Sequence, residues 1–187
     1  MKGVIILHKA INLNEYAGHI INSLQHGILL TTKANDKVNT MAIGWGTLGI
    51  NWTRPIFAAY IREGRYTRSL LDTNPEFTVN IPVNINKDSQ KIAAFCGTRS
   101  GRDLDKIQLA GLTLTESEKI SVPGILQLPL TLECRVLYRQ IQDLPLLNDE
   151  KLRDSLYPQN INSTAAGANR DVHVSYYGEI LASYIIE

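Results

Sequence analysis

The stretch that decides the fold spans residues 39–82 and reads NTMAIGWGTLGINWTRPIFAAYIREGRYTRSLLDTNPEFTVNIP. Runs of β-branched and aromatic residues alternate in it with breakers such as Gly64 and Pro82, and this pattern predicts short strands joined by tight connections. Asn39 and Asn80 occupy strand-like positions that asparagine rarely takes. The stretch therefore predicts a sheet that carries a polar site.

Runs of the same kind lie on both sides of this stretch. The segments predicted as strands are residues 28–32, 38–45, 56–62, 77–81, 130–141 and 172–186, the last interrupted at Gly178. Helices are predicted for residues 12–27, 66–71, 87–95, 103–109 and about 149–156. Gly44, Gly46 and Gly49 predict a bulge or a bend. Several strands, few helices and no parallel βαβ alternation predict a mainly β protein, a small antiparallel barrel.

Size and composition exclude several classes of function. The 187 residues are predicted to form one domain, residues 1–187. A net charge of +1 gives no basic surface for nucleic acid or an anionic membrane, so neither partner is expected. The opening residues contain too short an apolar run for a signal peptide or a membrane span. Cys96 and Cys134 form no metal or redox motif and suit a reducing cytosol, so we expect a cytoplasmic protein.

Two short segments contain the residues of an anion site. In the first, Arg65 and Thr67 stand at the start of a predicted helix, where free N–H groups and the helix dipole favour a phosphate. In the second, Ser100 precedes a predicted helix that carries Lys106. Each segment also has a structural interpretation, with Thr67 as an N-cap beside a solvated arginine and Ser100 in a polar turn. Two such segments in one small domain favour a phosphate site.

Other polar and aromatic residues suit a flat heteroaromatic ligand. The amides of Asn39 and Asn80 offer both a donor and an acceptor, as the pyrimidine edge of a flavin requires, although both also suit an edge strand or a turn. Trp45 is a stacking candidate or a core residue. His173 is a candidate proton donor or a structural histidine. No metal site is predicted, because no histidines or cysteines have ligand spacing.

The order of the motifs is more specific than any one of them. In chain order they are N-x-M-x-x-x-W (Asn39, Met41, Trp45), R-Y-T (65–67), F-x-V-N-x-P (77–82), S-G-R-D-x-D-K (100–106), A-G-L-T (110–113) and L-E-C-R-V (132–136), followed by His173 and the pair Gly178-Glu179. This order resembles the flavin reductase-like family of FMN-binding split barrels, and within it the flavoredoxins. The resemblance covers most of residues 27–141 and returns at 171–187.

The resemblance implies a homodimer of split barrels with noncovalently bound FMN near the subunit interface. It implies an isoalloxazine site lined by Asn39, Thr40, Met41, Ala42 and Trp45. It also implies a phosphate site of Thr67, Ser100 and Lys106 with Arg65 nearby, an Asn80 that faces the flavin or its ribityl chain, and a catalytic candidate, His173, close to the flavin.

The chain departs from the family pattern in two places. An insertion at about residues 142–170 separates the strand of L-E-C-R-V from the strand of His173, where family members usually have a short turn. The sequence also ends at Glu187, without the C-terminal tail that covers the flavin in many flavoredoxins. We expect the insertion to take over this covering role through Tyr157.

Three functions are compatible with these residues. The first is an NAD(P)H-dependent flavin reductase-like oxidoreductase, in which NAD(P)H is a diffusing donor and electrons pass through FMN. The second is a flavoredoxin-type electron carrier, which passes electrons to a redox protein partner without efficient NAD(P)H oxidation. The third is a barrel that binds another heteroaromatic such as haem or pyridoxal phosphate, and the motif order argues against it.

Overall fold

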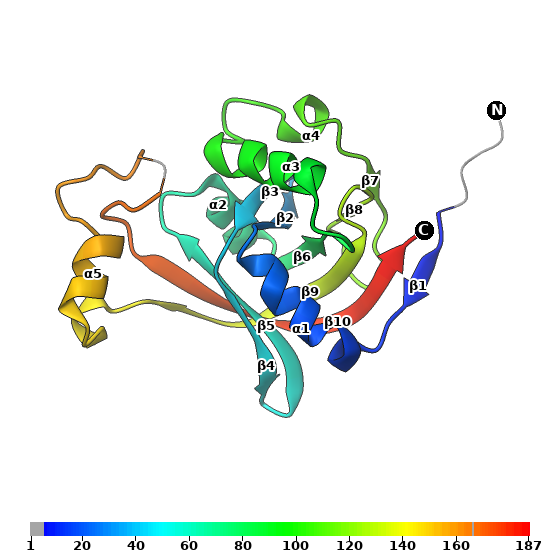
Figure 1. Cartoon of the computed structure of the whole chain (residues 1–187), viewed down its shortest axis with the longest axis horizontal. Coiled ribbons are helices and arrows are strands. Elements are labelled where there is room, and N and C mark those ends of the chain that lie inside the picture. Colours follow the sequence, from blue (N-terminus) through cyan, green and yellow to red (C-terminus); the bar gives the residue numbers. More distant parts are fainter. Residues whose placement is uncertain (1–5, 166) are drawn as a thin grey trace.

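The protein is a single large antiparallel sheet with helices along its sides. The computed structural model describes residues 6–165 and 167–187. In it the strands lie in the order β3-β2-β6-β9-β10-β5-β4, and β1 pairs with the end of β10 (Figure 1). The strands are β1 (His8–Ala10), β2 (Ile28–Ala34), β3 (Lys37–Ile43), β4 (Gly46–Asn51), β5 (Arg54–Arg62), β6 (Glu76–Ile81), β9 (Leu130–Ile141) and β10 (His173–Ile186). A separate ladder pairs β7 (Leu114–Thr115) with β8 (Gly124–Ile125). The predicted mainly β, antiparallel architecture is confirmed.

The helices begin and end largely where the sequence indicated. They are α1 (Leu13–Leu24), α2 (Tyr66–Thr73), α3 (Lys87–Thr98), α4 (Lys106–Leu109) and α5 (Glu150–Leu156), with a 3-10 turn, η1, at Leu144–Leu146. The Asn12 side chain caps α1 by accepting the N–H of Asn14. Gly27 follows α1 at a φ of +84°, a conformation in which glycine is unstrained. Throughout the described residues, every helix is too short or too polar to cross a bilayer.

The main core is formed mostly by side chains of the sheet and of α1 and contains several large aromatic side chains. Phe57, Phe77 and Tyr176 are almost fully buried there. Gly178 faces this core, because a Cβ at this position would lie 2.6 Å from the Phe77 ring. The register between β10 and β9 shifts between Tyr177 and Gly178, yet β10 continues through the glycine. The predicted interruption is therefore a close packing contact within a continuous strand.

Two local predictions were wrong. Gly44 lies in a bend between β3 and β4, as the sequence indicated, but Gly46 and Gly49 lie within strand β4, because this strand pairs residue by residue with β5. Its hairpin turns at Trp52 and Thr53, both at positive φ. The helix predicted from residue 103 begins only at Lys106, where the Asp105 side chain caps it by accepting the N–H of Gln108.

Two regions position the candidate site: the helices α3 and α4, and the segment between β9 and β10. α3 packs on β3 and β2, and α4 packs on β3 (Figure 1). The segment between β9 and β10, which contains α5, extends to the left of the view in Figure 1, away from α3 and α4. It returns to the sheet where His173, the first residue of β10, pairs with Arg62 at the end of β5. This pairing brings the insertion next to residues of β3 and α2.

Candidate functional site

The first part of the site is a cavity of about 520 Å³, named here the Lys106 cavity. It lies between β3, the start of α2 and the loop that joins α3 to α4. Six of the predicted site residues line it: Asn39, Met41, Arg65, Thr67, Ser100 and Lys106. The structure therefore brings together two segments that the sequence singled out separately as anion sites.

Lys106 is the buried cation of this cavity. Its side chain belongs to a residue only 4% exposed, and Nζ donates one hydrogen bond of 3.0 Å to the carbonyl of Cys96. Burial, and to a smaller extent the charge of Arg65, lowers the pKa of Lys106 to about 8. An ammonium group has three donors, and the described residues use only one of them. Lys106 is thus a cation with unused hydrogen-bonding capacity inside a cavity.

Thr67 and Asn39 form a buried polar pair that also lines the Lys106 cavity. Asn39 Nδ2 donates to Thr67 Oγ1 over 2.8 Å, which leaves the hydroxyl hydrogen of Thr67 available to another acceptor. The cap position of α2 is Arg65, which makes no side-chain cap bond, so Thr67 is not the N-cap that the sequence allowed. Gly101 packs directly on Asn39, and a Cβ at this glycine would collide with Asn39 Oδ1. The amide therefore requires glycine in the facing loop.

The rim of the Lys106 cavity contains the predicted residue Ser100 and, beside it, Arg102, which the sequence analysis did not select. Ser100 is exposed, and its Oγ accepts the N–H of Arg102. Arg102 donates to the Gly64 carbonyl over 3.2 Å and lies 5.6 Å from the ring centroid of Tyr66. Arg102 thus links the two loops that carry the anion-site residues. It was visible in the S-G-R-D motif, but only its neighbours were chosen.

The second part of the site is a cavity of about 290 Å³, named here the His173 cavity. The predicted residues that line it are Met41, Ala42, Trp45, Arg65 and His173. Met41 and Arg65 line both cavities, so the two adjoin. Trp45 is 40% exposed, and its ring centroid lies 4.6 Å from that of His173. This part of the site offers aromatic and apolar surface beside the cationic part.

His173 is held neutral. It is 6% exposed, and burial together with the charges of Arg62 and Arg65 lowers its pKa to about 3. The imidazolium form is therefore scarcely populated at neutral pH, and the role of His173 as a proton donor stays a prediction. The Tyr157 hydroxyl lies 2.8 Å from His173 Nδ1. Sequence reasoning placed Tyr157 over the ligand but did not foresee this bond.

Arg62 fixes the insertion to the sheet. Its Nη1 donates to the carbonyls of Asn169 and Asp171 over 3.2 and 2.6 Å, and Nη2 donates to that of Leu156 over 2.9 Å. The guanidinium carbon also lies 5.1 Å from the ring centroid of Tyr157. One arginine thus joins the middle of the insertion and its C-terminal end to β5, a role for which the sequence had given no signal.

Two predicted residues, Thr40 and Asn80, line neither cavity. Thr40 Oγ1 accepts a bond from Thr31 and donates to the Leu30 carbonyl. Asn80 Nδ2 donates to the hydroxyls of Thr31 and Thr78, and its Oδ1 accepts the N–H of Ile125. Both side chains are fully buried and engaged within the sheet. The structure therefore gives them a structural role.

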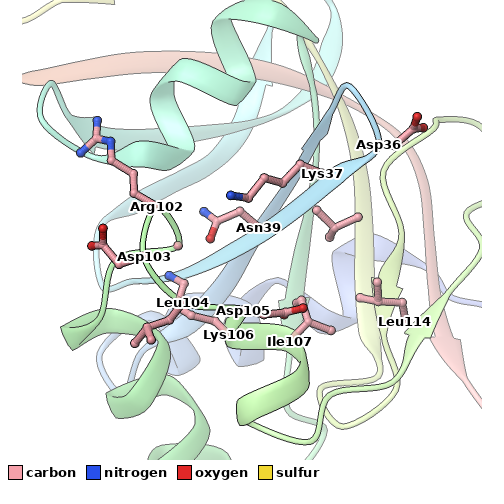
Figure 2. Close-up of a pocket in the computed structure, with 12 residues that line it drawn as sticks. Asp36, Lys37, Asn39, Arg102, Asp103, Leu104, Asp105, Lys106, Ile107 and Leu114 are labelled. Carbon is pink, nitrogen blue, oxygen red and sulfur yellow. The ribbon is translucent and has the colours of Figure 1, made fainter.

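A third cavity, of about 430 Å³, adjoins the Lys106 cavity at Asn39, Gly101 and Lys106. Figure 2 shows Lys37 and Asn39 projecting from β3, with Lys106 on the opposite wall. Its lining mixes cations with the carboxylates of residues 36, 103 and 105, so it has no clear charge preference. Within residues 6–165 and 167–187, no group of three or more His, Cys, Asp or Glu side chains could hold a metal ion.

Comparison with known proteins agrees with this geometry. The chain is 32% identical over 123 residues to an uncharacterized protein of Archaeoglobus fulgidus, covering 63% of this chain and 67% of that one. It is similar to the crystal structure of flavoredoxin from Methanosarcina acetivorans, with a TM-score of 0.60 and 25% identity over 85% of this chain and 67% of that one.

Further structures share the fold. An FMN-binding domain of flavin reductases-like enzyme from Shewanella baltica gives a TM-score of 0.64 at 16% identity, covering 98% of this chain and 79% of that one. The flavoredoxin of Desulfovibrio vulgaris gives 0.60 at 19% identity, covering 85% and 68%. The model of the flavin reductase like domain matches residues 23–182. The chain therefore belongs to the flavin reductase-like family of FMN-binding split barrels, as its motif order indicated.

Proposed function

We propose that the protein binds FMN noncovalently and acts as an NAD(P)H-dependent flavin reductase-like oxidoreductase. The observation that carries this proposal is the joined pair of cavities. The His173 cavity has a mostly aromatic and apolar lining together with Arg62 and Arg65, the Lys106 cavity is lined by cations and hydroxyls, and both share Met41 and Arg65. A phosphorylated heteroaromatic ligand likewise has a flat ring joined to an anionic group. When bound, a flavin supplies the hydride and electron transfer that the side chains cannot perform.

The Lys106 cavity fits a phosphate group. Among the described residues, Lys106 uses one of its three hydrogen-bond donors and the hydroxyl hydrogen of Thr67 has no acceptor. Hydrogen bonds from charged donors to phosphate are short and strong, and Arg65 adds a second positive charge. Burial and the charge of Arg65 lower the pKa of Lys106, and a bound dianion would stabilise its charged form against both. In this role the three residues anchor the cofactor and take no part in electron transfer.

The His173 cavity fits the ring. Trp45 and Met41 supply apolar contact, and Ala42 leaves room because its side chain is small. His173 is neutral and therefore acts as a hydrogen-bonding group at the edge of this cavity. The insertion closes the cavity on one side through Leu156. These residues orient the ring and exclude water from it.

A second candidate is a flavoredoxin-type electron carrier that exchanges electrons with a protein partner. The similarity to the flavoredoxin of Methanosarcina acetivorans, at 25% identity, favours it. The binding site would be the same in both cases. The two candidates differ in whether NADH or NADPH reduces the flavin rapidly.

We also propose that the chain forms a homodimer. Trp52 and Tyr138 are about half exposed and contact each other edge to face at 6.0 Å, near the tip of the β4–β5 hairpin. Ile50, on the same hairpin, is 76% exposed. Exposed apolar surface of this kind is suited to a partner. Light scattering at micromolar concentration should give the mass of a dimer, and a monomeric mass would refute the proposal.

Anaerobic stopped-flow absorbance tests the function directly. The purified protein is loaded with FMN and mixed with NADH or NADPH, and the flavin absorbance is followed. Rapid bleaching by one nucleotide is the expected result and identifies the donor. Tight FMN binding without rapid bleaching would support the electron carrier. Failure to bind FMN would refute both candidates.

A further inference from the structure

Tyr157 connects the insertion to the functional site. It follows α5 directly and is 5% exposed, so it is buried within a segment that is otherwise mostly exposed. Its hydroxyl lies 2.8 Å from His173 Nδ1 and 2.9 Å from Gln142 Oε1. The two rings meet edge to face, with an interplanar angle of 81°. Tyr157 thus contacts His173 through both its ring and its hydroxyl.

The direction of these hydrogen bonds follows from their partners. Gln142 Oε1 can only accept, so the single hydroxyl hydrogen of Tyr157 is donated to it. The hydroxyl oxygen then accepts from His173, which requires a proton on Nδ1. A neutral imidazole with a proton on Nδ1 has a lone pair on Nε2. Nε2 makes no hydrogen bond with the described residues, and His173 lines the His173 cavity.

We propose that Tyr157 is a positioning residue that holds His173 in the Nδ1–H tautomer, so that Nε2 offers a hydrogen-bond acceptor to the ligand site. The anchoring of the insertion makes this arrangement rigid. Arg62 bonds the carbonyl of Leu156, the residue before Tyr157. Trp45 lies against the other side of the imidazole, at 4.6 Å between ring centroids. The insertion therefore sets the chemistry of the site, beyond covering it.

An acceptor at this position selects for ligands with an N–H or O–H donor. If the proposed function is correct, the complementary groups are the N–H donors of the flavin ring, one of which is present only in the reduced form. The preference for a flavin N–H donor rests on that proposed function, whereas the tautomer of His173 is a property of the protein alone. The two can be tested separately.

The test is heteronuclear NMR of flavin-free protein labelled with 15N at histidine. The chain contains four histidines, and a His173→Gln variant identifies the signals of His173. In the wild type we expect the Nδ1 shift of a protonated nitrogen and the Nε2 shift of a nitrogen with a lone pair. In Tyr157→Phe we expect the population of the Nδ1–H tautomer to fall from nearly all to a minority, because Nδ1–H loses its acceptor.

Two further variants keep the test decisive. Tyr16→Phe removes a hydroxyl that lines neither cavity and should leave the His173 signals unchanged. Gln142→Met removes the acceptor of the Tyr157 hydroxyl, so the hydroxyl turns to Nδ1 and the proton moves to Nε2. This result replaces Tyr157→Phe if that variant does not fold.

The proposal is overturned if wild-type His173 carries its proton on Nε2, which is the result expected if Gln142 presents its amide nitrogen to Tyr157. It is also overturned if neither variant changes the tautomer. With FMN added, the wild type should bind reduced FMN more tightly relative to oxidised FMN than Tyr157→Phe does, by several-fold. If His173 has the expected tautomer but the protein does not bind FMN, the proposed function is refuted and the positioning role of Tyr157 stands.

Discussion

Replacement of Lys106 by methionine tests the phosphate site most directly. Methionine preserves most of the side-chain volume and removes the charge from a position that is 4% exposed. The structure leaves at least one ammonium hydrogen for a phosphate oxygen, because Nζ bonds only Cys96 among the described residues. A hydrogen bond to a charged group contributes about 1.5–3 kcal/mol. Lys106→Met should therefore raise the dissociation constant of FMN roughly 10- to 150-fold.

Riboflavin provides the internal reference for this experiment, because it lacks the phosphate. Fluorescence titration with FMN and with riboflavin should show a large loss for FMN and almost none for riboflavin. Lys91→Met is the matched control, since Lys91 is exposed and pairs only with Asp88. An equal loss for both ligands would show that the substitution damages the fold or the ring site. Unchanged FMN affinity would remove Lys106 from the phosphate site.

Three further predictions follow from the structure. FMN affinity should fall as pH rises through about 8, because Lys106 then loses its proton. Titrations between roughly pH 6 and 9.5 would show this dependence, which should be absent for riboflavin and for Lys106→Met. Arg62→Met should destabilise the protein by about 3 kcal/mol in chemical denaturation, because three backbone carbonyls lose a charged donor, whereas Arg99→Met, at an exposed position, should change stability little. Gly178→Ala should lower the thermal midpoint, at a cost of about 1–3 kcal/mol, because the new methyl group meets the Phe77 ring; Gly18→Ala, with open space around it, should not.

The sequence predicted most strands because each has a clear run of β-branched residues bounded by breakers. It failed at β4, where glycines at 46 and 49 suggested a bend. Pairing with β5 along the whole strand outweighs the low strand propensity of glycine, and this long-range effect is not visible in a local pattern. The shortening of α4 has a local cause, since the cap at Asp105 starts the helix later than the Ser-Gly-Arg turn suggested.

The candidate site shows the same division between local and long-range information. Lys106 and Thr67 were found because hydroxyls and cations near helix starts are local patterns, and the fold then placed them in one cavity. Asn80 was misread because an amide that can donate and accept suits a flavin edge and a network of buried hydroxyls equally well. The Tyr157–His173 bond joins a polar segment to a distant strand, and no local pattern connects them.

The charges of the site explain why its two parts belong together. Burial is the main cause of the lowered pKa values of His173 and Lys106; Arg62 and Arg65 add to the shift of His173, and Arg65 adds to that of Lys106. Among the described residues, no carboxylate lines the His173 cavity and Asp103 is the only one in the lining of the Lys106 cavity, so cations outnumber carboxylates in the lining of both, although Asp171 lies close enough to Arg62 to offset part of its charge. An arrangement of this kind is costly for a buried site without a ligand and favourable with an anionic one. Arg65 thus adds to the burial that keeps His173 neutral and also lies beside Lys106 in the proposed phosphate site, which couples the hydrogen-bonding state of one cavity to the charge of the other.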